Sequence, residues 1–124
     1  MSERRQRSGA SAQARGVGAE TIAATALQSR GWEVLGRRVR TAAGEIDLVA
    51  RRGGMLVFVE VKARPALADA VAALGPRQRA RLLAAAEIWL AEHPGEGAEG
   101  VRFDVVAVDA TGQVRRIRDA FRGD

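Results

Sequence analysis

Three charged residues lie close together in one apolar stretch of the chain. Asp47 stands in a first run of hydrophobic residues, and Glu60 and Lys62 close a second run that ends at Arg64. Two carboxylates on neighbouring strands could bind Mg²⁺, which usually takes one or two carboxylates, with water and substrate phosphate at its other positions. A lysine two residues after Glu60 shares its strand face and could orient an attacking water. These residue types and spacings are those that a metal-dependent phosphodiesterase needs.

The stretch that carries these residues is predicted to form a β-hairpin. Two runs rich in Val, Ile, Leu and Phe, residues 45–52 and 55–64, flank Gly53-Gly54, a dipeptide suited to a tight turn. The second run is apolar on both faces, which is typical of a central strand that is covered on both sides. Because burying charge is unfavourable, the Glu-Val-Lys at the end of this strand indicates either a function or a partner.

An ordinary cross-strand salt bridge, from Asp47 or Glu60 to Lys62, is the structural alternative. The alternation of strand side chains predicts that Glu45, Asp47 and Val49 share one face. Lys62 is the only lysine among 20 basic residues, and lysine and arginine are not interchangeable at a reactive centre. From the residues alone, the catalytic and structural interpretations both remain open.

The remaining elements must position this hairpin. Residues 17–29 favour a helix that ends at Gly31. On that helix Glu20 either complements the helix dipole or points inward as an accessory carboxylate. The pattern further predicts a strand at 32–40, a helix at 77–92, a strand at 101–109 and an edge strand at 113–118.

Length and composition narrow the class of protein. A chain of 124 residues is expected to form one domain, and without cysteine it has neither disulfides nor a zinc–thiolate site. The single histidine, His93, excludes His-rich metal sites, so a hard cation must be held by carboxylates. No apolar run approaches the roughly 20 residues that span a bilayer, and the basic N-terminus lacks the apolar segment of a secretory signal. We therefore expect a soluble, cytoplasmic protein.

The charge of the chain suits a polyanionic partner. The net charge is +5 and the sequence pI is about 11.3, which favours nucleic acid, although an Arg- and Ala-rich genome produces a similar composition. We expect residues 1–16 to form a disordered basic arm ahead of a domain over residues 17–124. Six arginines are candidate phosphate contacts: Arg37, Arg38, Arg40, Arg77, Arg79 and Arg81.

The order of these motifs resembles a known family. The chain has a helix acid, Gly-Glu-Ile-Asp, a hairpin, Phe-Val-Glu-Val-Lys-x-Arg, a helix and Arg-Phe-Asp-Val-Val, and this order resembles the uncharacterised YraN-like family over residues 16–108. That family is placed among the restriction-endonuclease-like, PD-(D/E)xK nucleases and is similar to archaeal Holliday-junction resolvases. The resemblance implies an α/β fold with a mixed sheet of four or five strands flanked by helices. It also implies a Mg²⁺-dependent endonuclease, with Mn²⁺ as a substitute, that acts on structured or branched DNA.

The resemblance also implies roles for individual residues. Asp47 and Glu60 match the metal ligands of the superfamily, Lys62 matches its water-orienting cation, and Glu20 matches its helix acid. All four are therefore candidate catalytic residues. A homodimer would place two such sites on opposite strands of a duplex or junction.

Some positions depart from the pattern or have no assigned role. Ile46 replaces the proline of the superfamily motif, Gln78 stands where the family often has a lysine, and Glu45 matches a family position of unknown role. Two other functions also fit the sequence. One is a nucleic-acid-binding module that keeps the nuclease fold without cutting, and the other is a basic protein with a structural carboxylate–lysine cluster and a protein partner.

Overall fold

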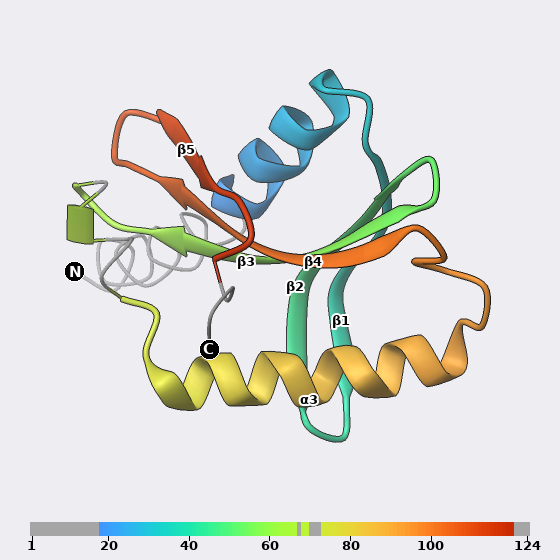
Figure 1. The fold of residues 1–124 in the computed structure, drawn as a ribbon. Coiled ribbons are helices and arrows are strands. Elements are labelled where there is room, and N and C mark those ends of the chain that lie inside the picture. Colours follow the sequence, from blue (N-terminus) through green and yellow to red (C-terminus); the bar gives the residue numbers. More distant parts are fainter. Residues whose placement is uncertain (1–17, 67, 70–72, 121–124) are drawn as a thin grey trace, which may run out of the picture.

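A five-stranded mixed β-sheet forms the centre of the protein (Figure 1). Its strands follow the order β1-β2-β3-β4-β5 along the sheet, in which β3 and β4 run parallel and the other neighbours run antiparallel. The predicted α/β fold with a mixed sheet of four or five strands flanked by helices is therefore confirmed. The strands are β1 (Glu33–Thr41), β2 (Gly44–Arg52), β3 (Met55–Ala63), β4 (Gly100–Val108) and β5 (Val114–Ile117).

The structure is a computed structural model that describes residues 18–66, 68–69 and 73–120. The predicted basic arm, residues 1–16, lies outside the described residues. Within them, each predicted strand lies within one or two residues of its expected position, and the short edge strand β5 is present. No helix among these residues is long and apolar enough to cross a membrane.

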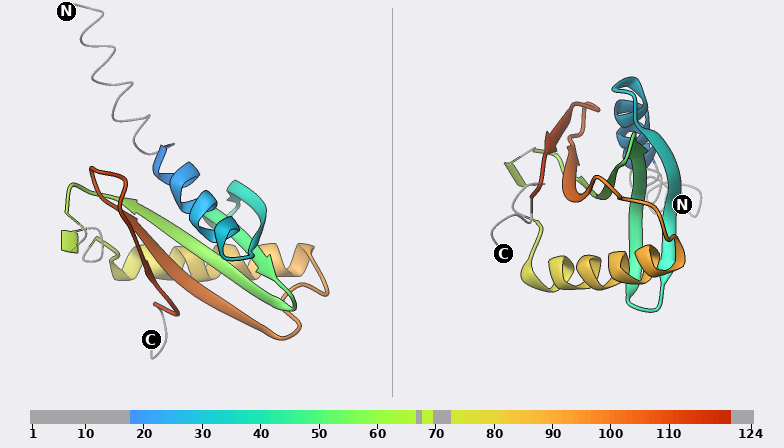
Figure 2. Two further views of the ribbon diagram at one scale, coloured as in Figure 1. Left: turned by 90° about the horizontal axis from the view of Figure 1, so that it is seen from above. Right: turned by 45° about the vertical axis from the view of Figure 1, so that its right-hand side comes forward.

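Two helices cover opposite faces of the sheet (Figures 1 and 2). The helix over residues 18–29 packs its small residues and Leu27 on a cluster that includes Val57 and Val59 of β3. The second helix, α3 (Pro76–Glu92), begins with a proline, as expected for a first helical turn. It packs on the other face, where Trp89 meets the ring of Phe58 edge-on, with 5.7 Å between the ring centroids. Because parallel neighbours need a crossover connection, α3 also links β3 to β4.

The β2–β3 hairpin has the predicted two-residue turn. Gly53 has a φ of 61°, a conformation that glycine adopts without steric penalty, and the first pair after the turn is Arg52 with Met55. The register of β1 against β2 shifts between Val34 and Gly36, which marks a bulge in β1 at this point. The central residues of β3 are fully buried, which confirms that it is a covered strand.

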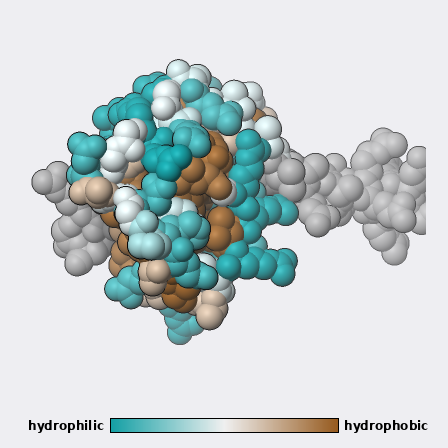
Figure 3. Space-filling view, turned by 90° about the vertical axis from the view of Figure 1, so that its right-hand side faces the viewer, coloured by the Kyte–Doolittle hydropathy of each residue, from teal (hydrophilic) through white to brown (hydrophobic). Residues whose placement is uncertain are grey.

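The surface near the starts of β3 and β4 is mainly polar. Figure 3 views the molecule from the side of the β2–β3 turn and the loop after α3, and hydrophilic residues surround a smaller hydrophobic area there. Glu60 and Lys62 lie toward the other end of the parallel strands, where β3 ends at Ala63 and β4 at Val108.

Candidate active site

The strands β2 and β3 separate at the end of their ladder, and Asp47 lies at that point. Backbone pairing ends with Leu48 opposite Val59. Beyond it, β1 and β2 run toward α3, while β3 continues beside β4 (Figure 1). The side chain of Asp47 takes over the contact, because its Oδ2 accepts a hydrogen bond from the backbone N–H of Val61 over 2.8 Å. The carboxyl group thus satisfies an amide that the backbone of β2 no longer reaches.

The prediction that Asp47 shares a strand face with Val49 is wrong. Ile46 and Val49, three residues apart, both pack in the cluster beneath α3. Leu48 packs with the opposite helix, and Asp47 lines a cavity on that same side. On β1, Arg37 pairs with Leu48 and Val39 pairs with Ile46, so Arg38 lies opposite Asp47. The φ of Arg38 is 49°, which is unusual for a residue other than glycine. This local break in the alternation turns Asp47 away from α3 and toward the helix over residues 18–29.

Asp47 lies among other acids, and its pKa is raised to about 7. The largest cause is burial, followed by the negative charge of Glu60. The hydrogen bond from the Val61 amide opposes this shift, whereas the charge of Glu20 and a hydrogen bond with Glu60 add to it. Acids from three separate elements, the first helix, β2 and β3, therefore converge at the fork between the strands.

Lys62 supplies a buried positive charge beside these acids. Its side chain is 8% exposed, and its Nζ lies 3.4 Å from Oε1 of Glu60, whose side chain is 16% exposed. A buried ammonium group needs such a partner, because removal from water is unfavourable for an unpaired ion. The Glu60–Lys62 salt bridge of the structural alternative is thus present, whereas Asp47 bonds to the Val61 amide. Lys62 also lines the same cavity as Asp47.

Glu20 points inward, as the accessory-carboxylate interpretation expects, and its place near the start of the helix also suits the helix dipole. Its side chain is only 14% exposed and lines the cavity that contains Asp47 and Lys62. Nε of Arg38 donates to both of its carboxylate oxygens, over 2.9 and 3.0 Å. The hydrogen bond and the charge of Glu20 raise the pKa of Arg38. Glu20 is therefore held in place by the same residue whose backbone interrupts the alternation of β1.

The donor set at the fork fits a hard cation. Asp47 and Glu60 supply carboxyl oxygens from adjacent strands, and their mutual repulsion, expressed in the raised pKa of Asp47, is of the kind that a divalent cation relieves. Among the described residues, no group of three or more Asp, Glu or His side chains is placed so that it could hold a metal ion. A magnesium site does not require one, because water and substrate oxygens commonly fill most of its positions.

The arginines predicted on β1 differ in their surroundings. Arg38 is bound to Glu20. The side chain of Arg40 is 90% exposed, and its Nε lies 3.8 Å from Oε2 of Glu45, a separation typical of a weak surface pair. Arg37 is exposed. Arg37 and Arg40 are thus better placed for a phosphate than Arg38.

Of the three arginines predicted at the start of α3, Arg81 packs against the β1–β2 turn. The aliphatic part of Arg81 lies so close to Gly44 that a Cβ added there would be 2.7 Å from its Cγ and Cδ. Arg77 and Arg81 are exposed, and Arg79 is half-buried. Arg81 therefore connects the start of α3 to the β1–β2 hairpin, whose first strand carries Arg37, Arg38 and Arg40.

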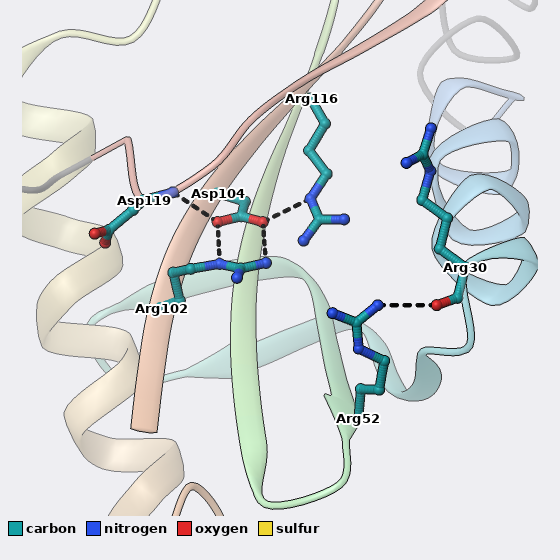
Figure 4. A network of polar contacts seen from close by, with 6 residues as sticks. All are labelled: Arg30, Arg52, Arg102, Asp104, Arg116 and Asp119. Carbon is teal, nitrogen blue, oxygen red and sulfur yellow. Dashed lines mark hydrogen bonds and ion pairs between the residues drawn. The ribbon is translucent and has the colours of Figure 1, made fainter. Parts of the chain in front are cut away.

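A second polar cluster, centred on Asp104 of β4, was not predicted from the sequence (Figure 4). Asp104 is fully buried and accepts hydrogen bonds from Arg102 Nε and Nη2, Arg116 Nε and the Asp119 amide, over 2.8 to 3.1 Å. The usable signal was the spacing of Arg102 and Asp104, which places opposite charges on one face of an otherwise apolar strand. The cluster ties β5 and the segment after it to β4.

Two arginines of this cluster, together with Arg52 of β2, surround Trp32. The guanidinium carbons of Arg52, Arg102 and Arg116 lie 4.6, 5.4 and 5.4 Å from the centre of the indole ring, within the range of cation–π attraction. Burial is the largest cause that lowers the pKa of Arg116, against the opposing effect of Asp104. Trp32 is 3% exposed, so it is a core residue and not a stacking platform for a base.

Comparison with known proteins defines the family. The model of the uncharacterised protein family UPF0102 matches residues 19–108, and the chain belongs to that family. A UPF0102 protein of Granulibacter bethesdensis is 63% identical over 109 residues, which cover 88% of this chain and 69% of the relative. UPF0102 proteins of Acidiphilium cryptum and Mesorhizobium japonicum are 50% and 46% identical over 123 residues, covering 99% of this chain and 95% and 98% of theirs.

Among solved structures, a distant similarity to this fold is found in an archaeal protein. It is SfsA of Pyrococcus furiosus in complex with Ca²⁺, with 14% sequence identity and a TM-score of 0.36. The similarity covers 87% of this chain and 63% of that one, so this chain spans less than two thirds of SfsA.

Proposed function

We propose that this protein is a Mg²⁺-dependent endonuclease that hydrolyses phosphodiester bonds of structured or branched DNA. The observation that carries the proposal is the convergence of Asp47, Glu60 and Glu20 at the fork between β2 and β3, next to the buried ammonium group of Lys62. Acids placed so that one has a pKa near 7 are unfavourable in a purely structural role. The motif order, similar to that of PD-(D/E)xK nucleases, supports the same assignment.

The proposal gives each residue a role. Asp47 and Glu60 would hold the metal ion, and Glu20 would act on it indirectly as an accessory carboxylate. Mg²⁺ bound there would lower the pKa of a coordinated water and neutralise charge on the phosphate, and Mn²⁺ could replace it. Metal binding requires the ionised form of Asp47, so affinity should rise with pH near the pKa of this residue.

Lys62 is the residue that this chain itself offers to the reacting phosphate. Its ammonium group has three donors, and one contact with Glu60 leaves capacity for an attacking water or a phosphate oxygen. Because the side chain is buried, its position is fixed before substrate binds, which favours stabilisation of charge that develops during the reaction.

A cleavage assay tests the proposal. Labelled single-stranded, duplex, flap and four-way-junction DNA would be incubated in Mg²⁺, Mn²⁺ or EDTA with the wild type, Asp47→Asn and Lys62→Met. We expect metal-dependent cleavage by the wild type, with branched substrates preferred, and a loss on the order of 10²-fold or more in both variants. Exposed Glu87 of α3 provides a control, because Glu87→Gln should cleave at the wild-type rate.

Two outcomes would contradict the proposal. Cleavage that persists in Asp47→Asn would point to a contaminating nuclease or a different site. Retarded but uncut DNA, equal for the wild type and both variants, would instead favour the non-cleaving nucleic-acid-binding module.

A further inference from the structure

A groove extends from the three acids along the carboxyl ends of the parallel strands. It has a volume of about 740 Å³, within the range of sites that bind small molecules. Glu20, Asp47 and Lys62 lie in it, but most of its lining comes from elsewhere. The first turns of the helix over residues 18–29 form one wall, and the turn between β4 and β5 forms the other. The carboxyl ends of parallel strands are a common place for ligands in α/β proteins.

The part of the groove away from the acids is mainly apolar, although the exposed Arg64, whose guanidinium donates to the carbonyl of Ala63, also lines it. Val61, Ala63 and Val108 at the strand ends line it, together with Ile22 of the helix and Ala110 of the turn. Ile22 is 36% exposed although it is a large aliphatic residue. An open apolar surface of this kind does not attract a phosphate group, but it can cover the face of a nucleobase.

The turn that forms the second wall is fixed and negatively charged. Oδ1 of Asp109 accepts hydrogen bonds from the Thr111 amide, the Thr111 hydroxyl and the Gln113 amide, over 2.7 to 2.9 Å. These contacts, with that of the Thr111 hydroxyl largest, hold the pKa of Asp109 below its usual value. Asp109 is therefore ionised at neutral pH and would repel a second phosphate placed at this end of the groove.

From this division of the groove we propose that it binds the base of an unpaired nucleotide next to the scissile phosphate. The inference rests on the proposed function, because it takes the phosphate to lie at Asp47 and Lys62. A base within a duplex is stacked on both faces and paired at its edge, so it can enter an apolar groove only when it is unstacked or already single-stranded. The preferred substrate would then be DNA with unpaired nucleotides, as at flaps, frayed ends and branch points, and not continuous duplex.

Binding without cleavage tests this inference separately from the nuclease activity. In EDTA, the affinity for single-stranded DNA and for blunt duplex of the same length would be measured by fluorescence anisotropy. A second series would carry one 2-aminopurine at successive positions of the single strand, because the emission of this base changes when it leaves the stack.

The critical variant is Ile22→Gln, which removes apolar contact area without adding charge. Leu83→Gln is the matched control, because Leu83 is also helical, is 38% exposed and lies outside the groove. We expect the wild type and Leu83→Gln to prefer the single strand and to change 2-aminopurine emission at one or two positions. In Ile22→Gln the preference should fall by about fivefold and the emission change should be lost.

The inference would be overturned by equal affinity for single strand and duplex, or by an Ile22→Gln protein that behaves as the wild type does. Circular dichroism of both variants verifies that the fold is retained. If the base contact is found but no DNA is cleaved under any condition, the groove inference stands and the nuclease proposal fails. If continuous duplex is cleaved at the same rate as branched DNA, the nuclease proposal stands and the groove inference fails.

Discussion

The carboxyl group of Asp47 accepts a hydrogen bond from the backbone N–H of Val61 at the point where β2 separates from β3. This contact joins the two strands after their backbone pairing has ended. Because the two oxygens of one carboxylate can accept several hydrogen bonds or bind a metal ion, the contact with Val61 leaves acceptor sites of Asp47 free. The same side chain can therefore hold the fork together and present oxygen to a ligand.

The first prediction concerns stability and pH at Asp47. Its pKa of about 7 in the folded protein exceeds the unfolded value of 3.8, so the folded state binds more protons between these two values. The free energy of unfolding should consequently fall as the pH rises from about 4 to 7. Asp47→Asn, which keeps an oxygen for the Val61 amide, should be more stable than the wild type at pH 8 by on the order of 1 to 4 kcal/mol, with no difference near pH 3.

Urea denaturation of both proteins between pH 3 and pH 8 measures this difference. Parallel pH profiles of the wild type and Asp47→Asn would show that Asp47 ionises normally in the folded protein.

The second prediction concerns divalent cations. At pH 8 Mg²⁺ should raise the Tm of the wild type, because a ligand that binds only the folded state stabilises it. At a Mg²⁺ concentration 100 times the Kd, the free energy of unfolding should increase by about 2.7 kcal/mol. The shift should vanish in Asp47→Asn and in Glu60→Gln, and EDTA should reverse it. Glu45 provides the control, because it is an exposed acid on the same strand, and Glu45→Gln should keep the full shift. Equal shifts in all four proteins would place the cation elsewhere.

The third prediction concerns the buried cluster at Asp104. Asp104→Ala leaves the guanidinium groups of Arg102 and Arg116 without their common partner, and loss of one member of a buried ion cluster costs about 3 to 5 kcal/mol. Thermal or urea unfolding should detect this loss, whereas Asp69→Asn at an exposed aspartate should change little. The cleavage rate of the milder variant Asp104→Asn, measured well below its Tm, should remain that of the wild type. A specific loss of cleavage in a fully folded Asp104→Asn protein would give this cluster a catalytic role.

The fourth prediction separates two neighbouring arginines. Arg37 is exposed, so Arg37→Gln should weaken DNA binding and reduce the slope of log K against log salt by about 1. Arg38 is already bound to Glu20, so Arg38→Gln should affect DNA binding less and lower the Tm more. Binding titrations at several salt concentrations, together with thermal melts, compare the two variants. The reverse pattern would mean that Arg38 leaves Glu20 for phosphate when DNA binds.

The sequence predicted the elements well because their signals are local. The Gly53 turn, the proline that begins α3 and the apolar β3 strand each follow from a few neighbouring residues. The strand face of Asp47 could not be predicted, because it depends on the left-handed backbone of Arg38 on another strand. Whether Glu20 pointed inward also depended on that distant residue.

The buried cluster was missed for a similar reason. Asp104 is surrounded by groups that are 2, 12 and 15 residues away, and only the nearest of them, Arg102, is visible in the alternation of a single strand. Its burial depends on the pairing of β4 with β5 and on Trp32, which lies before β1. A pattern within one element does not contain that information.

The burial of Lys62 also has a practical consequence. Because Lys62 is the only lysine, it is the only side-chain amine that acylating or reductively methylating reagents could modify. Its 8% exposure should make this reaction slow compared with that of the α-amino group. Mass spectrometry of the peptide that contains Lys62 would therefore report, at a single position, how often the fork opens to solvent and whether a bound nucleic acid closes it.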